Sequence, residues 1–336
     1  MVRENAVCLV FLATTMRAVY IEQHGGVEVL KHGDFAKPTA AAGQALVKVA
    51  VSGVNFIDIY HRMGLYKLPL PTVLGTEGAG TIEAVGEGVT GFKAGDPVAW
   101  TMARGSYAEF AAVPVTALVH VPAHVSLRDA AACMLQGMTA HYLTHSTFPL
   151  EQAHTALVHA AAGGTGRLIV QMAKLRGARV IATAGSPAKA EVARAAGADE
   201  VILYNDTDFL AEVKRLTGGA GVHVVYDGVG KATFERSIDS LRPRGMMVCF
   251  GNASGPVPPM DVLMLSAKGS LYLTRPTLGN YSSPEELAWR SGDLFSWLQD
   301  GKLKLMIEKE YLLAETAQAQ TDLAGRGTMG KLLIKI

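Results

Sequence analysis

The feature that most constrains this chain is a pattern over residues 156–183, in which an apolar run, a glycine cluster and two further apolar runs follow one another. Residues 156–160 have the length and composition of a buried strand in a parallel sheet. Residues 168–175 have the length of a helix, and Gly177 suits the end of that helix. Residues 179–183 predict a second strand. The pattern therefore predicts a strand–helix–strand unit with a glycine-rich first turn.

The glycines of this turn indicate a binding site for a dinucleotide. The N-terminus of a helix offers unpaired N–H groups and a favourable dipole to a pyrophosphate, and glycine lets the backbone come close to it. The usual fingerprint is G-x-G-x-x-G. Here Ala161, Gly163 and Gly166 occupy its three places, so the first glycine is missing. A tight structural turn is the alternative for the glycines alone, but the flanking strand and helix favour the binding site.

The residues after the second strand indicate which nicotinamide cofactor is bound. An NAD site has an Asp or Glu roughly 20 residues beyond the glycines, where it binds the ribose hydroxyls. No carboxylate lies between residues 179 and 190, where Gly185 and Ser186 are small and Lys189 is within reach of a 2′-phosphate. Tyr204, after the third strand, can pack alongside. Lys189 would otherwise be an ordinary solvated lysine. The missing acid predicts NADPH.

Composition limits the class of protein and its compartment. A chain of 336 residues suits two domains. With 49% hydrophobic residues, 18% charged residues and a net charge of +1, no nucleic-acid partner is expected. No stretch has the length of a membrane-spanning helix, so no membrane partner is expected either. Cys8, Cys133 and Cys249 are isolated, which predicts neither a zinc ribbon nor a disulfide framework and favours the cytoplasm.

The rest of the chain divides into a β-rich part and an α/β part. Between residues 16 and 126, short apolar strands alternate with glycine turns, which predicts an irregular β-barrel-like domain. Between residues 155 and 274, strands and helices alternate, which predicts a parallel sheet. Ser126 begins a predicted helix that Gly137 interrupts, with a second helix after it. We expect the segment after residue 276 to return to the first domain.

Residues 1–15 are treated separately. Met16 looks like a natural start that leads directly into a strand, and the preceding residues contain no A-x-A cleavage site. We interpret residues 1–15 as an upstream extension.

Seven motifs occur in order along the chain: N-F-I-D-I-Y (55–60), G-L-Y (64–66), G-T-E-G-A-G (75–80), H-A-A-A-G-G-T-G (159–166), V-V-Y-D-G-V-G (224–230), F-G-N-A-S-G (250–255) and G-S-L-Y-L-T-R-P (269–276). Together they resemble the quinone oxidoreductases, the zeta-crystallin-like, zinc-free branch of the medium-chain dehydrogenase/reductase superfamily. Thr165 is a small departure, because the family usually has Val there. The resemblance implies an α/β fold with two domains. One is a GroES-like, β-barrel-type catalytic domain (16–135 and 276–336), and the other is a Rossmann domain with a doubly wound parallel sheet (136–275).

The resemblance also implies NADPH-dependent reduction of quinones and a set of site residues. Asn55, Tyr60 and Tyr66 would line the substrate and nicotinamide pocket. The implied cofactor residues are Gln136 and Thr139 at the nicotinamide and its ribose, Gly163, Gly164, Thr165 and Gly166 at the pyrophosphate, Gly185, Ser186, Lys189 and Tyr204 at the 2′-phosphate, Phe250, Gly251, Asn252 and Ser254 along the cofactor, and Arg326 as a further cation. The alternatives are that Tyr60 is a core residue, that Asn55 is only a helix cap, and that Phe250 only ends a buried strand.

The sequence also predicts catalysis without a metal. Zinc dehydrogenases of the superfamily present Cys and His ligands where this chain has Asn55 and Thr76, neither of which is a usual zinc ligand. A quinone is easily reduced, so hydride transfer needs positioning more than a Lewis acid. Tyr66 or Tyr60 would hydrogen-bond a quinone oxygen and stabilise its developing charge. The amide of Asn55 would donate to the same end.

Two other functions are compatible with the residues, and one assembly is expected. The first is zinc-free, NADPH-dependent reduction of activated C=C bonds, as in enones or haloacrylates. The second is a non-catalytic NADPH-binding role, as a crystallin or an RNA-binding protein, which the near-neutral charge does not favour. Residues 262–265 and 271–274 are apolar and predict edge strands, which proteins cover or pair. Together with the resemblance, they predict a homodimer.

Overall fold

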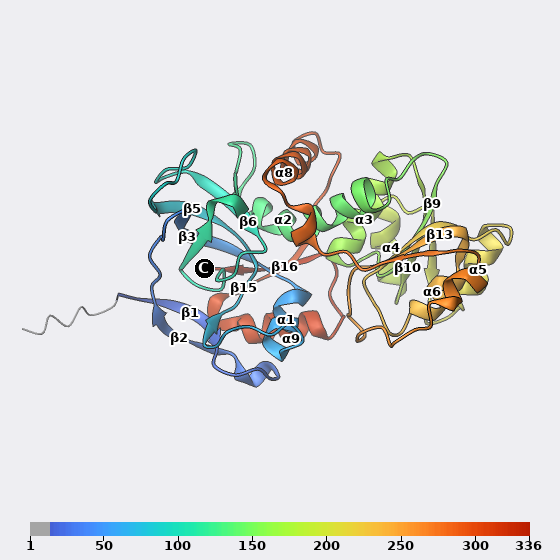
Figure 1. Ribbon diagram of the computed structural model, residues 1–336, viewed down its shortest axis with the longest axis horizontal. Helices are drawn as coiled ribbons and strands as arrows, with labels where there is room; N and C mark the ends of the chain where they lie inside the picture. The colour runs from blue at the N-terminus through green and yellow to red at the C-terminus, as the bar shows by residue number, and fades with distance from the viewer. Residues whose placement is uncertain (1–13) are drawn as a thin grey trace, which may run out of the picture.

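The computed structural model describes residues 14–336, so the predicted extension over residues 1–15 lies almost wholly outside the described part. The chain forms two lobes (Figure 1). The β-rich lobe contains a three-stranded sheet of order β2-β1-β4 and a seven-stranded sheet of order β15-β16-β3-β5-β6-β8, with β7 paired to β3. Its strands are β1 (Thr15–Ile21), β2 (Lys31–Ala36), β3 (Gln44–Val54), β4 (Thr72–Val73), β5 (Glu77–Val85), β6 (Pro97–Thr101), β7 (Phe110–Pro114), β8 (Leu118–His120), β15 (Ile307–Leu312) and β16 (Lys331–Lys335).

The large sheet of the β-rich lobe is curved by irregular pairing. The β3–β5 register shifts between Leu46 and Val47 and again between Val49 and Val51, and such bulges bend and twist a strand. β3 pairs with β5, β7 and β16, all antiparallel, so it lies at the centre of the sheet. The barrel-like domain predicted from the sequence is therefore present.

The parallel-sheet lobe contains six strands in the order β11-β10-β9-β12-β13-β14, and every neighbouring pair is parallel. In chain order this is 3-2-1-4-5-6, the doubly wound arrangement with a crevice at the carboxyl ends of the strands where the order reverses. The predicted parallel sheet is confirmed. Its strands are β9 (Thr155–Val158), β10 (Arg179–Ala184), β11 (Glu200–Leu203), β12 (Val222–Asp227), β13 (Leu241–Cys249) and β14 (Tyr272–Thr274), and its helices are α3 (Gly164–Leu175), α4 (Pro187–Ala195), α5 (Phe209–Leu216), α6 (Phe234–Asp239) and α7 (Leu263–Ala267).

The turn between β9 and α3 depends on its small residues. A Cβ atom on Gly166 would collide with the carbonyl oxygen of Ala160, so only glycine lets the helix begin this close to the strand. Ala160 itself has a φ of 50°, the left-handed conformation that glycine adopts more readily. This geometry presents the N-terminus of α3 at the reversal point of the sheet.

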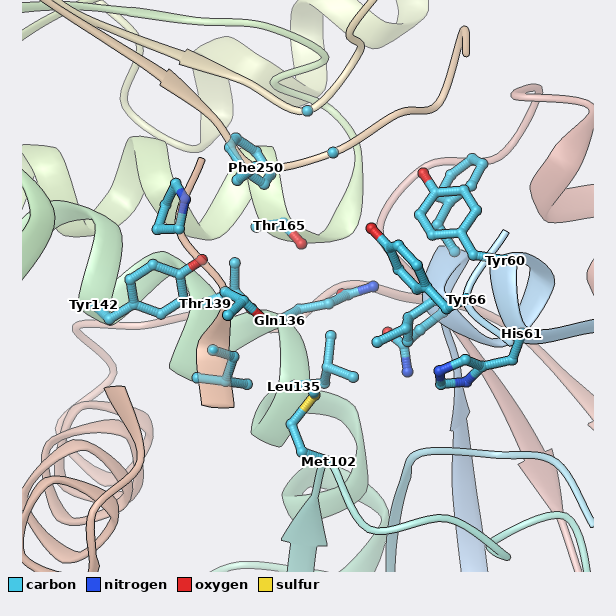
Figure 2. Close-up of a pocket in the computed structure, with 18 of the residues that line it drawn as sticks. Tyr60, His61, Tyr66, Met102, Leu135, Gln136, Thr139, Tyr142, Thr165 and Phe250 are labelled. Atoms are coloured by element: carbon cyan, nitrogen blue, oxygen red, sulfur yellow. The ribbon is translucent and has the colours of Figure 1, made fainter. Parts of the chain in front are cut away.

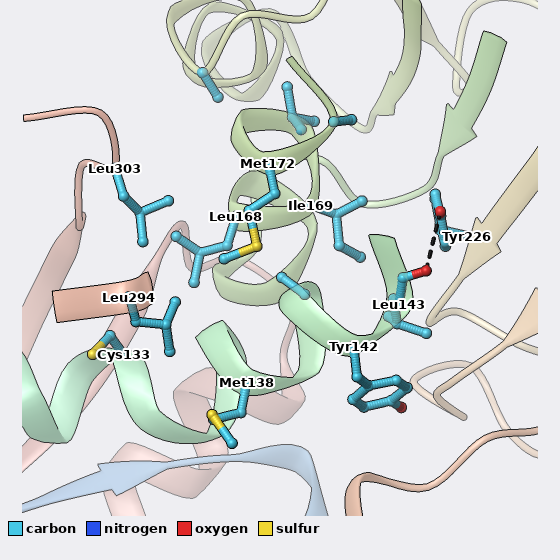
Figure 3. Packing of buried hydrophobic residues seen from close by; sticks show 14 of the residues in the cluster. Cys133, Met138, Tyr142, Leu143, Leu168, Ile169, Met172, Tyr226, Leu294 and Leu303 are labelled. Atoms are coloured by element: carbon cyan, nitrogen blue, oxygen red, sulfur yellow. Dashed lines mark hydrogen bonds between the residues drawn. The ribbon is translucent and has the colours of Figure 1, made fainter. Parts of the chain in front are cut away.

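One long helix, α2 (Leu127–Tyr142), joins the lobes and corrects the prediction that Gly137 would interrupt it. Ser126 caps α2 as predicted, and the chain continues beyond it as a π-helical segment, η3 (Leu143–Thr147). Gly137 instead allows close packing, because a Cβ there would lie 2.9 Å from a terminal methyl group of Leu294 of α8 (Pro284–Gln299). Figure 3 shows α2 residues packed beside α3 and Leu294.

The C-terminal segment returns to the β-rich lobe, as predicted. It contains η4 (Leu278–Tyr281), α8, β15, η5 (Leu313–Glu315), α9 (Thr316–Ala324) and β16. β16 pairs antiparallel with β3. Since α2 runs without a break through residues 135 and 136, the exact domain boundaries remain a prediction.

The two apolar segments predicted as edge strands differ in structure. Residues 272–274 form β14 at the edge of the parallel sheet, but residues 263–267 form the short helix α7, so that part of the prediction was wrong. Between residues 14 and 336, no helix is long and apolar enough to cross a membrane.

Candidate active site

A cavity of about 530 Å³ lies between the two lobes. The parallel-sheet lobe contributes Gly228, Phe250 and Arg275, which directly follow β12, β13 and β14, and Thr165 in the first turn of α3. The β-rich lobe contributes the start of α1 (Phe56–Met63) and the loop after it, and α2 lies between them. Figure 2 shows Tyr60 and Tyr66 on one side of the cavity and Tyr142 of α2 on the other, with Leu135, Gln136 and Thr139 of α2 between them.

Asn55 is the N-cap residue of α1, and its side chain is buried. Its backbone N–H donates to Asp58 Oδ2 at 3.0 Å. Its amide nitrogen donates to Glu77 Oε2 at 2.8 Å and to the carbonyl of Gly53 at 3.3 Å. Asn55 lines the cavity, but both amide hydrogens already have protein acceptors. A substrate oxygen would recruit this donor only by replacing one of them, so its predicted role as a substrate donor stays a prediction.

Tyr60 and Tyr66 line the cavity next to each other, with ring centroids 5.6 Å apart and nearly perpendicular planes. The hydroxyl oxygen of Tyr60 accepts a hydrogen bond from the backbone N–H of Asn252 at 3.1 Å, which leaves its own proton free to be donated. Burial raises the pKa of Tyr60, so the phenol keeps that proton at neutral pH. Tyr60 therefore lies at the cavity wall with a donor available, and its role in the reaction stays a prediction.

Arg275 also lines the cavity, and our reading of the sequence did not select it. One guanidinium nitrogen donates to the carbonyl of Cys249 at 3.1 Å, and the other lies 3.5 Å from the hydroxyl of Tyr66. The described lining contains no carboxylate. Burial lowers the pKa of His61 to about 4, so this lining residue is neutral at pH 7. Arg275 is thus the permanent positive charge of the described cavity wall.

The first turn of α3 approaches the cavity from the opposite lobe. Thr165 lines the cavity, as do Gln136 and Thr139 of α2. A Cβ on Gly164 would collide with the side-chain oxygen of Gln136, so the glycine lets this side chain lie directly against the first turn of α3. Gly163 caps the N-terminus of α3, which begins at residue 164. These predicted residues lie together in the structure.

The residues predicted for the 2′-phosphate lie away from the cavity, around the start of α4. The hydroxyl of Ser186 accepts from the backbone N–H of Lys189 at 3.3 Å and caps this helix. The ammonium of Lys189 donates to the carbonyl of Arg326 at 2.5 Å, and burial lowers the pKa of Lys189. A Cβ on Gly185 would lie 2.5 Å from the hydroxyl of Tyr204. Lys189 is therefore held in place and is not a freely solvated lysine.

The predicted residues of the loop after β13 differ in whether they line the cavity. Phe250 and Gly251 line the cavity, and the ring of Phe250 covers Gly228. Asn252 meets Tyr60 through its backbone N–H. Ser254 is outside the lining, and its hydroxyl donates to the carbonyl of Val229 at 2.8 Å.

The positions that correspond to zinc ligands contain a hydrogen-bonded polar cluster. Thr76 donates to Asp58 Oδ1 at 2.8 Å, and Tyr107 donates to Asp58 Oδ2 at 2.9 Å. Burial raises the pKa of Asp58 to about 6. In residues 14–336 no group of three or more His, Cys, Asp or Glu side chains is arranged to hold a metal ion.

Two histidines four residues apart were not selected from the sequence. His141 and His145 stack with ring centroids 4.2 Å apart. Burial and the nearby Arg290 guanidinium lower the pKa of His141 to about 3. Arg290 lies 2.9 Å from the Nδ1 atom of His141, so a cation already occupies this position.

The fold and the cavity define a two-domain oxidoreductase of the medium-chain dehydrogenase/reductase class. Residues 41–123 match the model described as "Alcohol dehydrogenase GroES-like domain", and residues 164–290 match the model described as "Zinc-binding dehydrogenase". Within this class, the chain belongs to the quinone oxidoreductase family. A quinone oxidoreductase of Pseudomonas aeruginosa is 44% identical over 95% of this chain and 99% of its own length.

Two further similar proteins extend the comparison, one through its solved structure and the other through a different named activity. The crystal structure of Escherichia coli quinone oxidoreductase complexed with NADPH has a TM-score of 0.93 and 41% identity, over 95% of this chain and all of that one. A 2-haloacrylate reductase of a Burkholderia species is 39% identical over 94% of this chain and 98% of its own length.

Proposed function

We propose that the protein is an NADPH-dependent quinone oxidoreductase that works without a metal ion. The observation that carries this proposal is the cavity between the lobes, which brings Tyr66, Arg275 and the first turn of α3 to one space. The family to which the chain belongs supports it.

The residues along the crevice fit NADPH. The first turn of α3 offers backbone N–H groups to a pyrophosphate. Lys189 and the Tyr204 hydroxyl offer donors to a 2′-phosphate, whose oxygen would replace the Arg326 carbonyl on Lys189. The E. coli relative was solved with NADPH, which supports the same cofactor here. When bound, NADPH supplies the hydride.

The chain's own residues stabilise the charge that the reaction creates. Transfer of a hydride to a quinone leaves negative charge on one of its former carbonyl oxygens, and one proton from solvent completes the hydroquinone. The Tyr66 hydroxyl and the Arg275 guanidinium lie 3.5 Å apart, so one oxygen can interact with both. Donors held in place before the reaction stabilise such charge without reorganisation. Tyr60 offers a second hydroxyl to the same cavity.

A second candidate is the reduction of activated C=C bonds, as in 2-haloacrylates. The Burkholderia relative and the guanidinium of Arg275, which can pair with a substrate carboxylate, favour it.

The first experiment is therefore NADPH oxidation by the purified protein with naphthoquinone, benzoquinone, a cyclic enone and 2-chloroacrylate, with NADH as the cofactor control. Faster turnover of the quinones supports the proposal, and preference for 2-chloroacrylate overturns it. A chelator should leave turnover unchanged, and its loss with recovery on added zinc would contradict the metal-free mechanism.

We also propose a cytoplasmic homodimer. Val262 and Leu263 are 73% and 72% exposed, and they lie close in sequence to Tyr272 of the edge strand β14, which is 58% exposed. An exposed apolar edge is usually paired or covered. Cys133 and Cys249 are free thiols, which suits a reducing compartment. A monomer mass in light scattering at micromolar concentration would contradict the dimer.

A further inference from the structure

A buried ion pair joins β16 to β5 beneath the cavity. The ammonium of Lys331 donates to Glu77 Oε2 at 2.5 Å and to Asn55 Oδ1 at 2.8 Å. The side chains of Lys331 and Glu77 are 3% and 0% exposed. Burying two charges often costs more free energy than their attraction returns, so such a pair is weak evidence for a role in stability alone. Its position gives it another role.

The ion pair contacts the cavity wall in two places. Asn55, which accepts from Lys331, lines the cavity from the start of α1. Leu135 lines it from α2, and its backbone N–H donates to Glu77 Oε1 at 2.5 Å. One ammonium and one carboxylate therefore fix the backbone of α2 and the amide of Asn55 relative to each other.

The same lysine is tied to the turn that precedes α3. The N–H of Gly330, immediately before Lys331, donates to the carbonyl of Ala162 at 2.9 Å, and Gly330 forms a bridge with Gly163. A Cβ on Gly53 would lie 2.7 Å from the ammonium, so Gly53 leaves the space that the ion pair fills. The pair is thus enclosed between the substrate side and the cofactor side of the cavity.

We propose that Lys331 is a positioning residue for the substrate pocket. By accepting the Lys331 hydrogen bond, the Asn55 oxygen is turned away from the carboxylate, and the amide N–H groups point to Glu77 and Gly53. The Lys331 charge allows Glu77 to remain an acceptor for both Leu135 and Asn55. This inference rests on the proposed function, because its readout is quinone reduction.

The test begins with Lys331→Met, which keeps the length of the side chain and removes its charge. The Michaelis constant for the quinone should rise at least about tenfold and turnover should fall, while the Kd for NADPH, measured by fluorescence, should change less than about threefold. A general loss of structure would instead weaken both. Lys335→Met, on an exposed lysine of the same strand, is the matched control and should behave like wild type.

A double variant separates the orientation of Asn55 from the cost of an unpaired buried charge. In Lys331→Met with Glu77→Gln, which removes both buried charges, the glutamine oxygen can accept from Leu135, but its amide nitrogen can donate only to the oxygen of Asn55. The Asn55 amide is then reversed, so the Michaelis constant for the quinone should stay at least about tenfold above wild type. If Lys331→Met alone does not fold, the double variant carries the test, and a wild-type Michaelis constant for the quinone in that folded variant overturns the proposal. So does a Lys331→Met variant with wild-type kinetics. If wild type reduces no quinone, the proposed function fails, which is a separate result.

Discussion

The hydroxyl of Tyr60 accepts a hydrogen bond from the backbone N–H of Asn252 at 3.1 Å, and this contact joins α1 of the β-rich lobe to the loop after β13. The two residues are separated by 192 positions in sequence. Phe250 and Gly251, which precede Asn252, line the cavity. The contact therefore sets the width of the cavity at the side where the lobes meet.

Tyr60→Phe should lower kcat/KM for quinone reduction by roughly 2- to 10-fold, because it leaves the Asn252 N–H without its acceptor and removes a hydroxyl from the cavity. This range corresponds to a net free energy of about 0.5–1.5 kcal/mol for one hydrogen bond. The ring should still pack against Tyr66. The effect is measured by steady-state kinetics of Tyr60→Phe and of the control variant Tyr20→Phe, because Tyr20 lies outside the cavity lining. Identical kinetics for both variants would show that the contact has no role in the reaction.

Arg275→Met should lower kcat for quinones more than it changes the Kd for NADPH. A charge-assisted hydrogen bond is worth about 1.5–3 kcal/mol, so kcat/KM should fall on the order of 10- to 100-fold. An exposed arginine, Arg236, gives the control variant Arg236→Met. If 2-chloroacrylate rather than quinone turnover is lost, Arg275 binds a substrate carboxylate, and the second candidate function gains support.

Lys189→Ala should raise the Michaelis constant for NADPH by about 10- to 100-fold and leave that for NADH nearly unchanged, since NADH has no 2′-phosphate. Turnover at saturating NADPH should change little, because the contact is equal in ground and transition states. Lys93→Ala, at an exposed lysine of the β-rich lobe, is the control. Equal weakening of both cofactors would assign Lys189 a structural role only.

His141 should make stability depend on pH on the acid side. Its folded-state pKa of about 3, lowered by burial and Arg290, lies below the unfolded value of about 6.5. The unfolded state then binds more protons between these values, so stability falls as pH falls through this window, by at most about 1.4 kcal/mol per pH unit from this group.

His141→Gln tests the contribution of His141 to this pH dependence directly, because glutamine can accept from Arg290 and donate to Asp293 without titrating. Urea unfolding at pH 6.5 and pH 5 should show a smaller loss of stability in the variant than in wild type. Equal losses in both proteins would mean that other groups cause the acid sensitivity.

The sequence predicted those parts of the fold that follow from local pattern. The glycines around residue 164 and the alternating strands and helices gave the parallel sheet, because periodicity and turn chemistry are local properties. Gly137 was misread as a helix breaker, since nothing nearby in sequence indicates that Leu294 packs against it. Residues 263–267 are apolar enough for a strand but form a helix.

The site was predicted where motifs exist and missed where distant residues meet. Arg275 lay inside a recognised motif, yet one arginine after a strand gives no sign that its side chain reaches a tyrosine 209 positions away. Lys331 and Glu77 are 254 positions apart, and a lysine in a C-terminal strand is ordinarily expected at the surface. Only the folded chain shows that this one is buried.

The uninterrupted helix α2 limits how this protein can be recombined with its relatives. Its apolar residues belong to a core that includes Ala79 and Ala99 of one lobe and Val158 and Val224 of the other. A chimera joined at residues 135 and 136 would therefore combine half of one parent's helix with half of the other's and mismatch both cores at once. Joints placed before Ser126 and after α8 would transfer the helix together with Leu294, its packing partner at Gly137.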